Sequence, residues 1–241
     1  MDRGIRGFGG TVADAEPDTI AVAGRAPVLR LEGVSKRFGS RAVLREVDLA
    51  LAPGEVVAIC GRNGAGKTTL LRIAAGLLIA DAGSVRIAGL DPERDRRDYQ
   101  RRVGLLAAGS SGLYGRLPVE RHLDFCAGIA LIPRRVRRAA IERATAAFDL
   151  SALRGLRVDR LSMGQRQRLR LALAFLHDPE LALLDEPLTS LDEEGGELLE
   201  ARLDRLRASG GSALLCAPTG EHDGITVDRT LAIDDGRLVT R

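Results

Sequence analysis

The fold of this chain is decided by one stretch, which reads Val56-Val57-Ala58-Ile59-Cys60-Gly61-Arg62-Asn63-Gly64-Ala65-Gly66-Lys67-Thr68-Thr69. Its first five residues form an apolar run, which is typical of a buried strand. The segment that follows, from Leu70 to Leu78, predicts a helix. A strand, a glycine-rich loop and a helix in this order are the context in which a phosphate-binding loop works.

The glycines of this loop let backbone N–H groups crowd around a polyphosphate, and the helix adds a partial positive charge at its N-terminus. Lys67 is placed to reach the β- and γ-phosphates of a nucleotide, and the Thr68 hydroxyl to ligate Mg²⁺. The alternative is a glycine-rich turn with a chance lysine, but Lys67 is one of only two lysines in an arginine-rich chain. The predicted phosphate-binding residues are Gly61, Arg62, Asn63, Gly64, Ala65, Gly66, Lys67, Thr68 and Thr69.

A second cluster ends another apolar segment, Leu181-Ala182-Leu183-Leu184-Asp185-Glu186-Pro187. In a parallel α/β sheet, ligands bind at the carboxyl ends of the strands. Asp185 is therefore placed to hold Mg²⁺, directly or through water. Glu186 points the other way and suits the role of polarising an attacking water molecule. Two adjacent acids also occur in plain exposed turns, but the phosphate loop upstream favours the catalytic interpretation.

Composition limits the classes of function that this chain can have. The formal net charge is +3 in 241 residues, and 3% of the residues are aromatic, with no tryptophan. A nucleic-acid partner is not expected, because such proteins use a basic field or aromatic side chains that stack on bases. The apolar runs are shorter than the roughly 18–20 residues that cross a bilayer. Cys60, Cys126 and Cys216 lie in apolar segments, which predicts small buried thiols in a reducing cytosol.

The order of predicted elements indicates one domain at residues 27–241, preceded by a disordered leader at 1–26. Helices are predicted at 161–176 and 193–207, and a mostly helical, arginine-rich insertion at about 94–160. Strands that alternate with helices favour an α/β fold with a mainly parallel sheet. The predicted strands are 28–31, 42–51, 56–60, 83–87, 181–184, 213–216, 231–233 and 238–239.

Three further segments complete a pattern. Leu161-Ser162-Met163-Gly164-Gln165 opens the helix upstream of the acidic pair, Ser190-Leu191-Asp192 follows that pair, and Phe38 precedes the phosphate loop. Together with both clusters, these segments resemble the nucleotide-binding subunit of ABC-type ATPases over residues 27–241. They stand where that family has its LSGGQ signature, its D-loop and the aromatic residue that stacks on adenine. Met163 replaces the first signature glycine, and Phe38 could equally be a core residue.

The resemblance implies a P-loop NTPase core with a mainly parallel sheet, a small antiparallel β subdomain and a helical insertion. It implies that the chain binds ATP and Mg²⁺, and that Ser162, Gly164, Gln165 and Asp192 join Phe38 and the loop in binding nucleotide. In the family, ATP lies between the phosphate loop of one domain and the signature of another. The expected partners are a second nucleotide-binding domain and a transmembrane permease. The expected location is cytoplasmic, at the inner face of the cell membrane.

Two positions depart from the family pattern. The family has a glutamine after the strand that leads into the insertion. Ala108 stands at that position here. Ser110 or Ser111 could supply a hydroxyl in place of the missing amide. The family also has a histidine at the end of a later strand, and Pro218 stands in its place. Proline cannot donate a hydrogen bond from its backbone or its side chain. His222, one helical turn later, is then the remaining candidate.

A basic run within the insertion and two histidines have less specific interpretations. The default for the run is a solvated helix face, and the alternative is contact with acidic coupling loops or with lipid headgroups. His122 and His177 are predicted to be structural or exposed, because neither lies in a phosphate motif. The basic run consists of Arg134, Arg135, Arg137 and Arg138.

The leading interpretation is an ATPase subunit that powers a separate permease. Export is favoured, because Gly112-Leu113-Tyr114-Gly115-Arg116-Leu117 resembles a segment of drug- and polysaccharide-exporter subunits. The alternative is a hydrolysis-poor regulatory subunit paired with an intact partner. Loss of both γ-phosphate sensors favours that alternative, whereas Glu186 and the signature segment argue against it. A soluble ATPase acting on DNA or translation is disfavoured, because the chain has neither a long coiled coil nor a second module.

Overall fold

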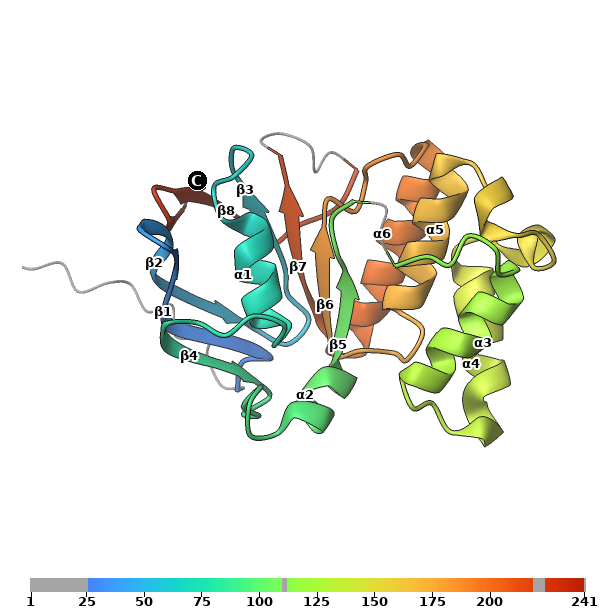
Figure 1. The fold of residues 1–241 in the computed structure, drawn as a ribbon, viewed down its shortest axis with the longest axis horizontal. Helices are drawn as coiled ribbons and strands as arrows, with labels where there is room; N and C mark the ends of the chain where they lie inside the picture. Colours follow the sequence, from blue (N-terminus) through green and yellow to red (C-terminus); the bar gives the residue numbers. More distant parts are fainter. Residues whose placement is uncertain (1–25, 110–111, 219–223, 241) are drawn as a thin grey trace, which may run out of the picture.

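A six-stranded sheet forms the centre of the computed structural model, which describes residues 26–109, 112–218 and 224–240 (Figure 1). The predicted leader lies outside these residues apart from residue 26. The strand order is β5-β6-β7-β3-β8-β9, and every pair is parallel except β8 with β9. The strands are β3 (Val56–Cys60), β5 (Val103–Leu106), β6 (Leu181–Asp185), β7 (Ser212–Ala217), β8 (Arg229–Asp234) and β9 (Arg237–Thr240).

The central strands β3, β6 and β7 are buried along their whole length. Parallel strands that are covered on both faces have continuous apolar sequences instead of alternating ones. That explains why the sequence shows them as short apolar runs. The phosphate loop follows β3, and the acidic pair stands at the end of β6, so both predicted clusters lie at the carboxyl edge of one sheet.

A second, smaller sheet is antiparallel and has the strand order β2-β1-β4. Along β1 the buried residues Leu29, Leu31 and Val34 face one apolar cluster, which also includes residues of β3 and of the first helix. The sheet consists of β1 (Leu29–Phe38), β2 (Arg41–Leu51) and β4 (Ala82–Ile87). This arrangement confirms the expected combination of a mainly parallel sheet with a small antiparallel one.

Helices cover both faces of the large sheet and create two apolar cores (Figure 1). One core joins the small sheet to α1 and α2, and the Tyr99 hydroxyl of α2 donates to the Ala74 carbonyl of α1 at 2.6 Å. The other core lies among α3, α4, α5 and α6. The bounds are α1 (Lys67–Ala74), α2 (Arg96–Arg102), α3 (Val119–Ile129), α4 (Arg134–Ala147), α5 (Met163–Ala174) and α6 (Glu193–Ala208).

The sequence predicts that the helical insertion begins at about residue 94, which is earlier than the structure shows. Residues 103–106 form β5, which pairs with β6 in the register Val103 to Leu181 and extends the large sheet. The end of α5 packs tightly on this strand, because a Cβ on Gly104 would lie 2.2 Å from the Ala174 carbonyl oxygen. The helical part outside the sheet therefore begins after Leu106 and contains α3, α4 and two short 3-10 turns, Ser151–Leu153 and Val158–Arg160.

Other sequence predictions need smaller changes. The helix predicted at 161–176 spans Met163–Ala174, because Ser162 caps its N-terminus. Cys60 and Cys216 are buried free thiols as predicted, whereas Cys126 is half-buried. In the part of the chain that the structure describes, every helix is too short or too polar to cross a bilayer.

Candidate functional site

The glycine-rich loop makes a sharp turn between the end of β3 and the start of α1. Gly66 has a φ of 115°, and it is the residue that precedes the first turn of α1. A Cβ at this position would lie 3.0 Å from the Val43 carbonyl oxygen of β2. Only glycine therefore combines this backbone conformation with such close packing. The turn leaves the N–H groups of the first turn of α1 at the loop, which is the arrangement that binds phosphate.

Lys67 is the first residue of α1, and its side chain folds back over the loop. Its ammonium donates to the Gly61 carbonyl at 2.6 Å and to the Arg62 carbonyl at 3.3 Å. The residue is only 6% exposed. The Lys67 ammonium thus lies inside the loop, among the backbone groups that would surround a polyphosphate.

Thr68 and Asp185 connect the loop to the end of β6. The Thr68 hydroxyl donates to Asp185 Oδ2 at 2.7 Å, and Asp185 is 3% exposed. A hydroxyl and a carboxylate fit Mg²⁺, which takes oxygen ligands and usually only one or two carboxylates from a protein. Within the described ranges no group of three or more His, Cys, Asp or Glu could hold a metal ion. Mg²⁺ bound to proteins usually keeps several waters and takes the remaining oxygens from substrate phosphates, which agrees with a pair of this kind.

Glu186 leaves the strand in a left-handed backbone conformation, with a φ of 51°. Its N–H donates to the Cys216 carbonyl of β7 at 2.7 Å, which fixes the turn at the sheet edge. Together with Asp185 it lines a pocket of about 540 Å³ that also includes Met163 of the signature segment. Glu186 lines a second cavity of about 210 Å³ as well, and Pro218 is part of that wall. The structure therefore brings Pro218 into the same cavity wall as Glu186.

The signature segment forms the N-terminus of α5 and points outward. Ser162 Oγ accepts from the Gln165 N–H at 3.1 Å, and Gln165 Oε1 accepts from the Ser162 N–H at 3.0 Å. This reciprocal pair is a capping box. Met163 is 71% exposed, whereas Gly164 is close to the Ser190 carbonyl, since a Cβ there would lie 3.0 Å away. Ser162 and Met163 are thus exposed, while Gly164 packs on the segment that leads to Asp192.

Asp192 caps α6 and is joined to the signature helix by a residue that the sequence analysis missed. Its Oδ1 accepts from the Gly195 N–H at 2.9 Å and from the Arg168 guanidinium at 2.9 Å. Arg168 also pairs with Glu194 at 2.9 Å, and these bonds to Arg168 and Gly195 lower the pKa of Asp192. Arg168 lies on α5, so the two helices are fastened together beside the signature.

Phe38 is exposed, so its alternative role as a core residue is wrong. Its ring is 52% exposed at the end of β1. The Lys36 ammonium lies 5.7 Å from the ring centroid and also pairs with Asp81 at 2.6 Å. An exposed aromatic ring is available to stack on a base, and the neighbouring ion pair holds one side of it in place.

Ala108 follows a residue that takes part in a half-buried hydrogen-bond network at the end of β5. The Arg170 guanidinium donates to the Ala107 carbonyl and to Gln167 Oε1, the latter at 2.8 Å. Gln167 Nε2 in turn donates to the Pro187 carbonyl at 3.0 Å. Burial lowers the pKa of Arg170. These hydrogen bonds connect the segment that enters the helical insertion with the residue that follows Glu186. No sequence motif indicated this connection.

Of the three histidines and two serines that the sequence singles out, only His122 and His177 lie within the described residues. His222, Ser110 and Ser111 lie outside the described residues. His122 is buried, its Nε2 accepts from the Tyr114 N–H at 3.0 Å, and burial lowers its pKa. His177 Nε2 donates to the Val103 carbonyl at 3.0 Å. Both of these histidines have structural contacts.

Comparison with known proteins identifies the family. A family model described as ABC transporter matches residues 44–189. The chain is 31% identical over 218 residues to the ABC transporter ATP-binding protein NatA of Bacillus subtilis (strain 168), covering 89% of each chain. It is 34% identical to the daunorubicin resistance ATP-binding protein DrrA3 of Streptomyces coeruleorubidus, covering 88% of this chain and 66% of that protein.

Import proteins are among the relatives as well. The chain is 38% identical to the aliphatic sulfonates import ATP-binding protein SsuB of Albidiferax ferrireducens, covering 89% of this chain and 73% of that protein. A solved ATP-binding subunit of an ABC transporter has a TM-score of 0.80 at 25% identity, with coverage of 88% and 90%. The dimeric bacterial ABC transporter cassette MJ0796 has the same fold, with a TM-score of 0.76 at 24% identity and coverage of 87% and 96%.

The fold and the phosphate loop define a P-loop ATPase. Within that class, the chain belongs to the ABC transporter family, as the subunit that binds and hydrolyses ATP.

Proposed function

We propose that this subunit drives a separate membrane permease by hydrolysing ATP between its own phosphate loop and the signature segment of a second nucleotide-binding domain. The observation that carries the proposal is the grouping of three features at the carboxyl edge of one sheet. These are the Lys67 loop after β3, the Thr68–Asp185 hydrogen bond, and Glu186 at the end of β6.

Each of these side chains has a role in the proposed reaction. Lys67 and the loop N–H groups bind the β- and γ-phosphates of ATP. Thr68 and Asp185 would hold Mg²⁺, which neutralises charge on the phosphates when it is bound. Glu186 orients an attacking water by accepting a hydrogen bond from it, and the water attacks the γ-phosphorus while the bond to the β–γ bridging oxygen breaks and ADP leaves. Phe38 stacks on the adenine ring.

The second domain supplies the other half of the site. The signature at the start of α5 and the phosphate loop at the start of α1 lie on opposite sides of the large sheet (Figure 1). The exposed Ser162, the Gly164 N–H and the positive end of the α5 dipole are therefore available to a γ-phosphate held by another domain. Arg168 holds Asp192 beside them, where the family resemblance places the contact between domains.

An apolar surface on α3 and its flanks is the proposed docking site for the permease. The Tyr114 and Phe125 rings meet edge to face with centroids 5.4 Å apart, and both are exposed. Within the basic run, Arg134, Arg135 and Arg138 are exposed, as a solvated face predicts, whereas Arg137 is half-buried and donates to the Ile132 carbonyl at 3.1 Å. Other exposed apolar residues, at the end of α3, just after it and at the start of α4, are Ile129, Leu131 and Val136.

Export is the proposed direction of transport, and it depends on the resemblance of the segment from Gly112 to Leu117 to exporter subunits. A relative named for drug resistance is compatible with it, although other relatives are named for import. Transport assays in inside-out membrane vesicles test the direction. Accumulation of cargo in the vesicles supports export, and ATP-driven loss of preloaded cargo contradicts it.

A regulatory role is the second candidate function, and Pro218 and Ala108 are the observations that favour it. Both stand at positions where the family has γ-phosphate sensors, and Pro218 lines a cavity with Glu186. Under this alternative the chain binds ATP but turns it over slowly, and an intact partner domain carries the hydrolysis.

Co-expression with the membrane protein encoded by a neighbouring reading frame tests the main proposal. The two proteins are expected to co-purify, and ATP turnover is expected to rise at least about tenfold in the complex. A chain that does not bind the membrane protein, and that hydrolyses ATP at full rate alone, would contradict it. A complex in which Glu186→Gln leaves hydrolysis unchanged would instead support the regulatory role.

A further inference from the structure

Arg168 lies in the second turn of α5, just behind the signature segment, and its side chain is only 9% exposed. Its Nη2 lies 2.9 Å from Asp192 Oδ1 and 2.9 Å from Glu194 Oε2, and its Nη1 lies 3.6 Å from Asp149 Oδ2. Asp149 follows α4, whereas Asp192 and Glu194 belong to the start of α6. One planar guanidinium, with several donors in a fixed arrangement, therefore joins α5 to two other segments of the chain.

The expected contribution of this cluster to stability is small. The side chains of Asp149, Asp192 and Glu194 are 63%, 68% and 65% exposed, and ion pairs with exposed partners contribute little. Without the guanidinium none of the three carboxylates would be left buried, and Asp192 would keep its bond from the Gly195 N–H. The main effect of the contacts is therefore to fix where the start of α6 lies relative to α5.

The same parts of the chain meet at a second point, inside the signature segment. A Cβ on Gly164 would lie 3.0 Å from the Ser190 carbonyl oxygen, so the first turn of α5 packs directly on the chain that leads to Asp192. Ser190 has a φ of 66°, a left-handed conformation that is uncommon for residues other than glycine. Residues 190–192 are thus held against α5 at both ends, by Gly164 at Ser190 and by Arg168 at Asp192.

The phosphate loop of the same chain lies away from this cluster. It precedes α1, on the opposite side of the large sheet from α5 (Figure 1). The contacts of Lys67 with the loop carbonyls and the Thr68–Asp185 hydrogen bond involve none of the residues that Arg168 holds. A change at Arg168 should therefore move the signature and Asp192 but leave the chain's own phosphate-binding groups in place.

We infer that Arg168 is a positioning residue that acts across the pair of domains. It holds the exposed start of α5 and Asp192 in the arrangement that ATP bound to the second domain requires, and it has no part in binding ATP to its own domain. The inference rests on the proposed function, in which the signature of one domain completes the site of the other.

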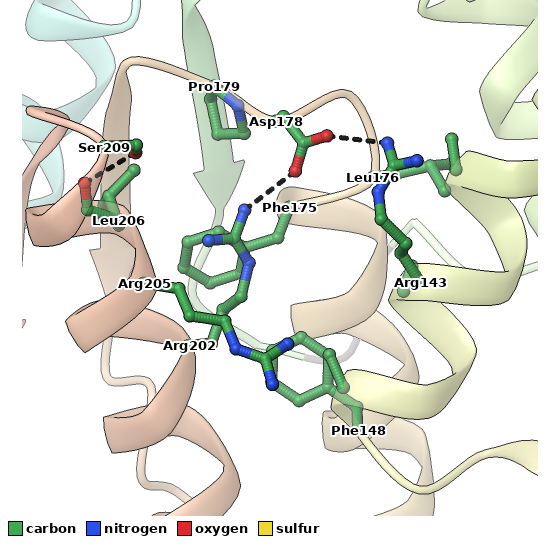
Figure 2. Close-up of a pocket in the computed structure, with 13 residues that line it drawn as sticks. Arg143, Phe148, Phe175, Leu176, Asp178, Pro179, Arg202, Arg205, Leu206 and Ser209 are labelled. Atoms are coloured by element: carbon green, nitrogen blue, oxygen red, sulfur yellow. Dashed lines mark hydrogen bonds and ion pairs between the residues drawn. The ribbon is translucent and has the colours of Figure 1, made fainter. Parts of the chain in front are cut away.

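A similar arginine at the far end of the same two helices provides a matched control. Arg202 of α6 is 12% exposed and donates to Asp178 at 3.2 Å, and Asp178 also accepts from Arg143 of α4 at 2.7 Å, as Figure 2 shows. Asp178 follows α5, whose twelve residues separate it from the signature by roughly 18 Å at 1.5 Å per residue. Arg202→Met therefore removes a comparable ion pair without disturbing the signature.

Single variants test whether the role of Arg168 is more than structural. Arg168→Met is expected to lower kcat about tenfold, because misplacing groups around a reacting centre by about 1 Å can cost up to 10²-fold in rate. Affinity for a fluorescent ATP analogue, measured where the chain is monomeric, should change less than twofold. Arg168→Lys keeps the charge and should recover part of kcat, and Arg202→Met should change kcat less than twofold. Thermal unfolding confirms that each variant is folded, and Arg168→Lys replaces Arg168→Met if the latter is not.

A mixture of two variants tests whether Arg168 acts across the pair. Lys67→Ala has a defective phosphate loop and an intact Arg168, and Arg168→Met has the reverse. A pair made of one copy of each contains one site in which an intact loop faces a signature held by an intact Arg168. Phosphate release by the mixture is therefore expected to exceed the sum of the rates of the two variants measured separately at the same concentrations.

A control mixture separates this inference from the proposed function. Gly164→Glu damages the signature itself, because it places a bulky carboxylate against the Ser190 carbonyl, and Lys67→Ala should rescue it in the same way. If only the Gly164→Glu mixture gains activity, Arg168 acts within its own domain, and the inference is overturned while the proposed function stands. If neither mixture gains activity, two copies of the chain do not share a site, and the inference falls with that part of the proposed function. An unchanged kcat in Arg168→Met, or an equal fall in Arg202→Met, would also overturn it.

Discussion

At the scale of single residues, Lys67 has the clearest expected effect, because the loop carbonyls of Gly61 and Arg62 hold its ammonium in place. Lys67→Ala is expected to weaken ATP binding by at least about a hundredfold. Charge-assisted hydrogen bonds contribute about 1.5–3 kcal/mol each. The β-phosphate and the γ-phosphate each lose one such bond, and a total loss of about 3 kcal/mol corresponds to about a hundredfold in affinity. Titration with a fluorescent ATP analogue measures the change. Arg72→Ala, an exposed arginine on the same helix, is the control, and normal affinity of the Lys67 variant would disprove the assignment of the loop.

Pro218 is expected to slow hydrolysis, because it contributes no hydrogen-bond donor to the cavity that it shares with Glu186. Loss of one preorganised donor typically costs about 10²–10³ in rate. The isolated chain should therefore turn ATP over slowly, and Pro218→His should raise kcat at least about tenfold, allowing for imperfect placement. Steady-state phosphate release measures both rates.

Two controls separate the donor from other effects of the substitution. Pro218→Ala restores the same backbone N–H as Pro218→His but adds no side-chain donor, and it should leave kcat unchanged. His222→Ala should also change little. A fast wild type combined with an inactive His222→Ala variant would show that His222 is the γ-phosphate sensor and that the register assigned to Pro218 is wrong.

The functional residues that the sequence could predict are those that lie next to one another along the chain. The loop from Gly61 to Thr69 and the acidic pair were found because their spacing along the chain is itself the signal. Arg168 and Arg170 were missed, because arginine is common in this chain and their partners lie far away in the sequence. The exposure of Phe38 could not be predicted either, since one aromatic residue at a strand end is compatible with a core or a surface position.

At the scale of secondary-structure elements, Arg170 of α5 connects the end of β5 to the segment after β6. Arg170→Met keeps most of the side chain's length but leaves the Ala107 carbonyl and Gln167 Oε1 without this donor. We expect a loss of about 1 kcal/mol in the free energy of unfolding, at the low end of the cost of unsatisfied buried groups, because these acceptors are only half-buried. We also expect kcat to fall about tenfold, because Glu186 loses part of its support, while the KM for ATP changes less than twofold.

Denaturant unfolding and steady-state kinetics measure the two effects of Arg170→Met. Arg170→Lys should restore part of kcat, because an ammonium can reach only one of the two acceptors well. A loss of stability without any change in kcat would show that Arg170 supports the fold but does not position Glu186.

The sequence predicted elements best where burial is complete. The apolar runs of β3, β6 and β7 were recognised because helices cover both faces of these strands. The insertion was placed too early because β5 has only four residues and lies next to the polar helix α2. Its position as a strand depends on pairing with β6, which is distant in the sequence.

At the scale of the whole molecule, Glu186→Gln is expected to trap a pair of domains around ATP. A neutral amide keeps the shape of the side chain but polarises water poorly, so hydrolysis should fall by about 10²–10⁴ while ATP binding remains. Size-exclusion chromatography with ATP and Mg²⁺ should then show a dimer. Glu197→Gln, at an exposed position on α6, is the control. A monomer at all concentrations, with wild-type turnover, would contradict both the role of Glu186 and the shared site.

The pairing of β3 has a consequence for how the molecule is made. Val57 pairs with Leu214 of β7 on one side and with Arg229 of β8 on the other, and both partners belong to the last fifth of the chain. During synthesis the phosphate loop leaves the ribosome early, but the strand that holds it has no neighbours until nearly all of the protein has emerged. Contacts this distant make folding slow and leave strand edges exposed to aggregation. A chain that stops before β7 would contain the phosphate loop, the signature and the acidic pair, and should still fail to bind ATP.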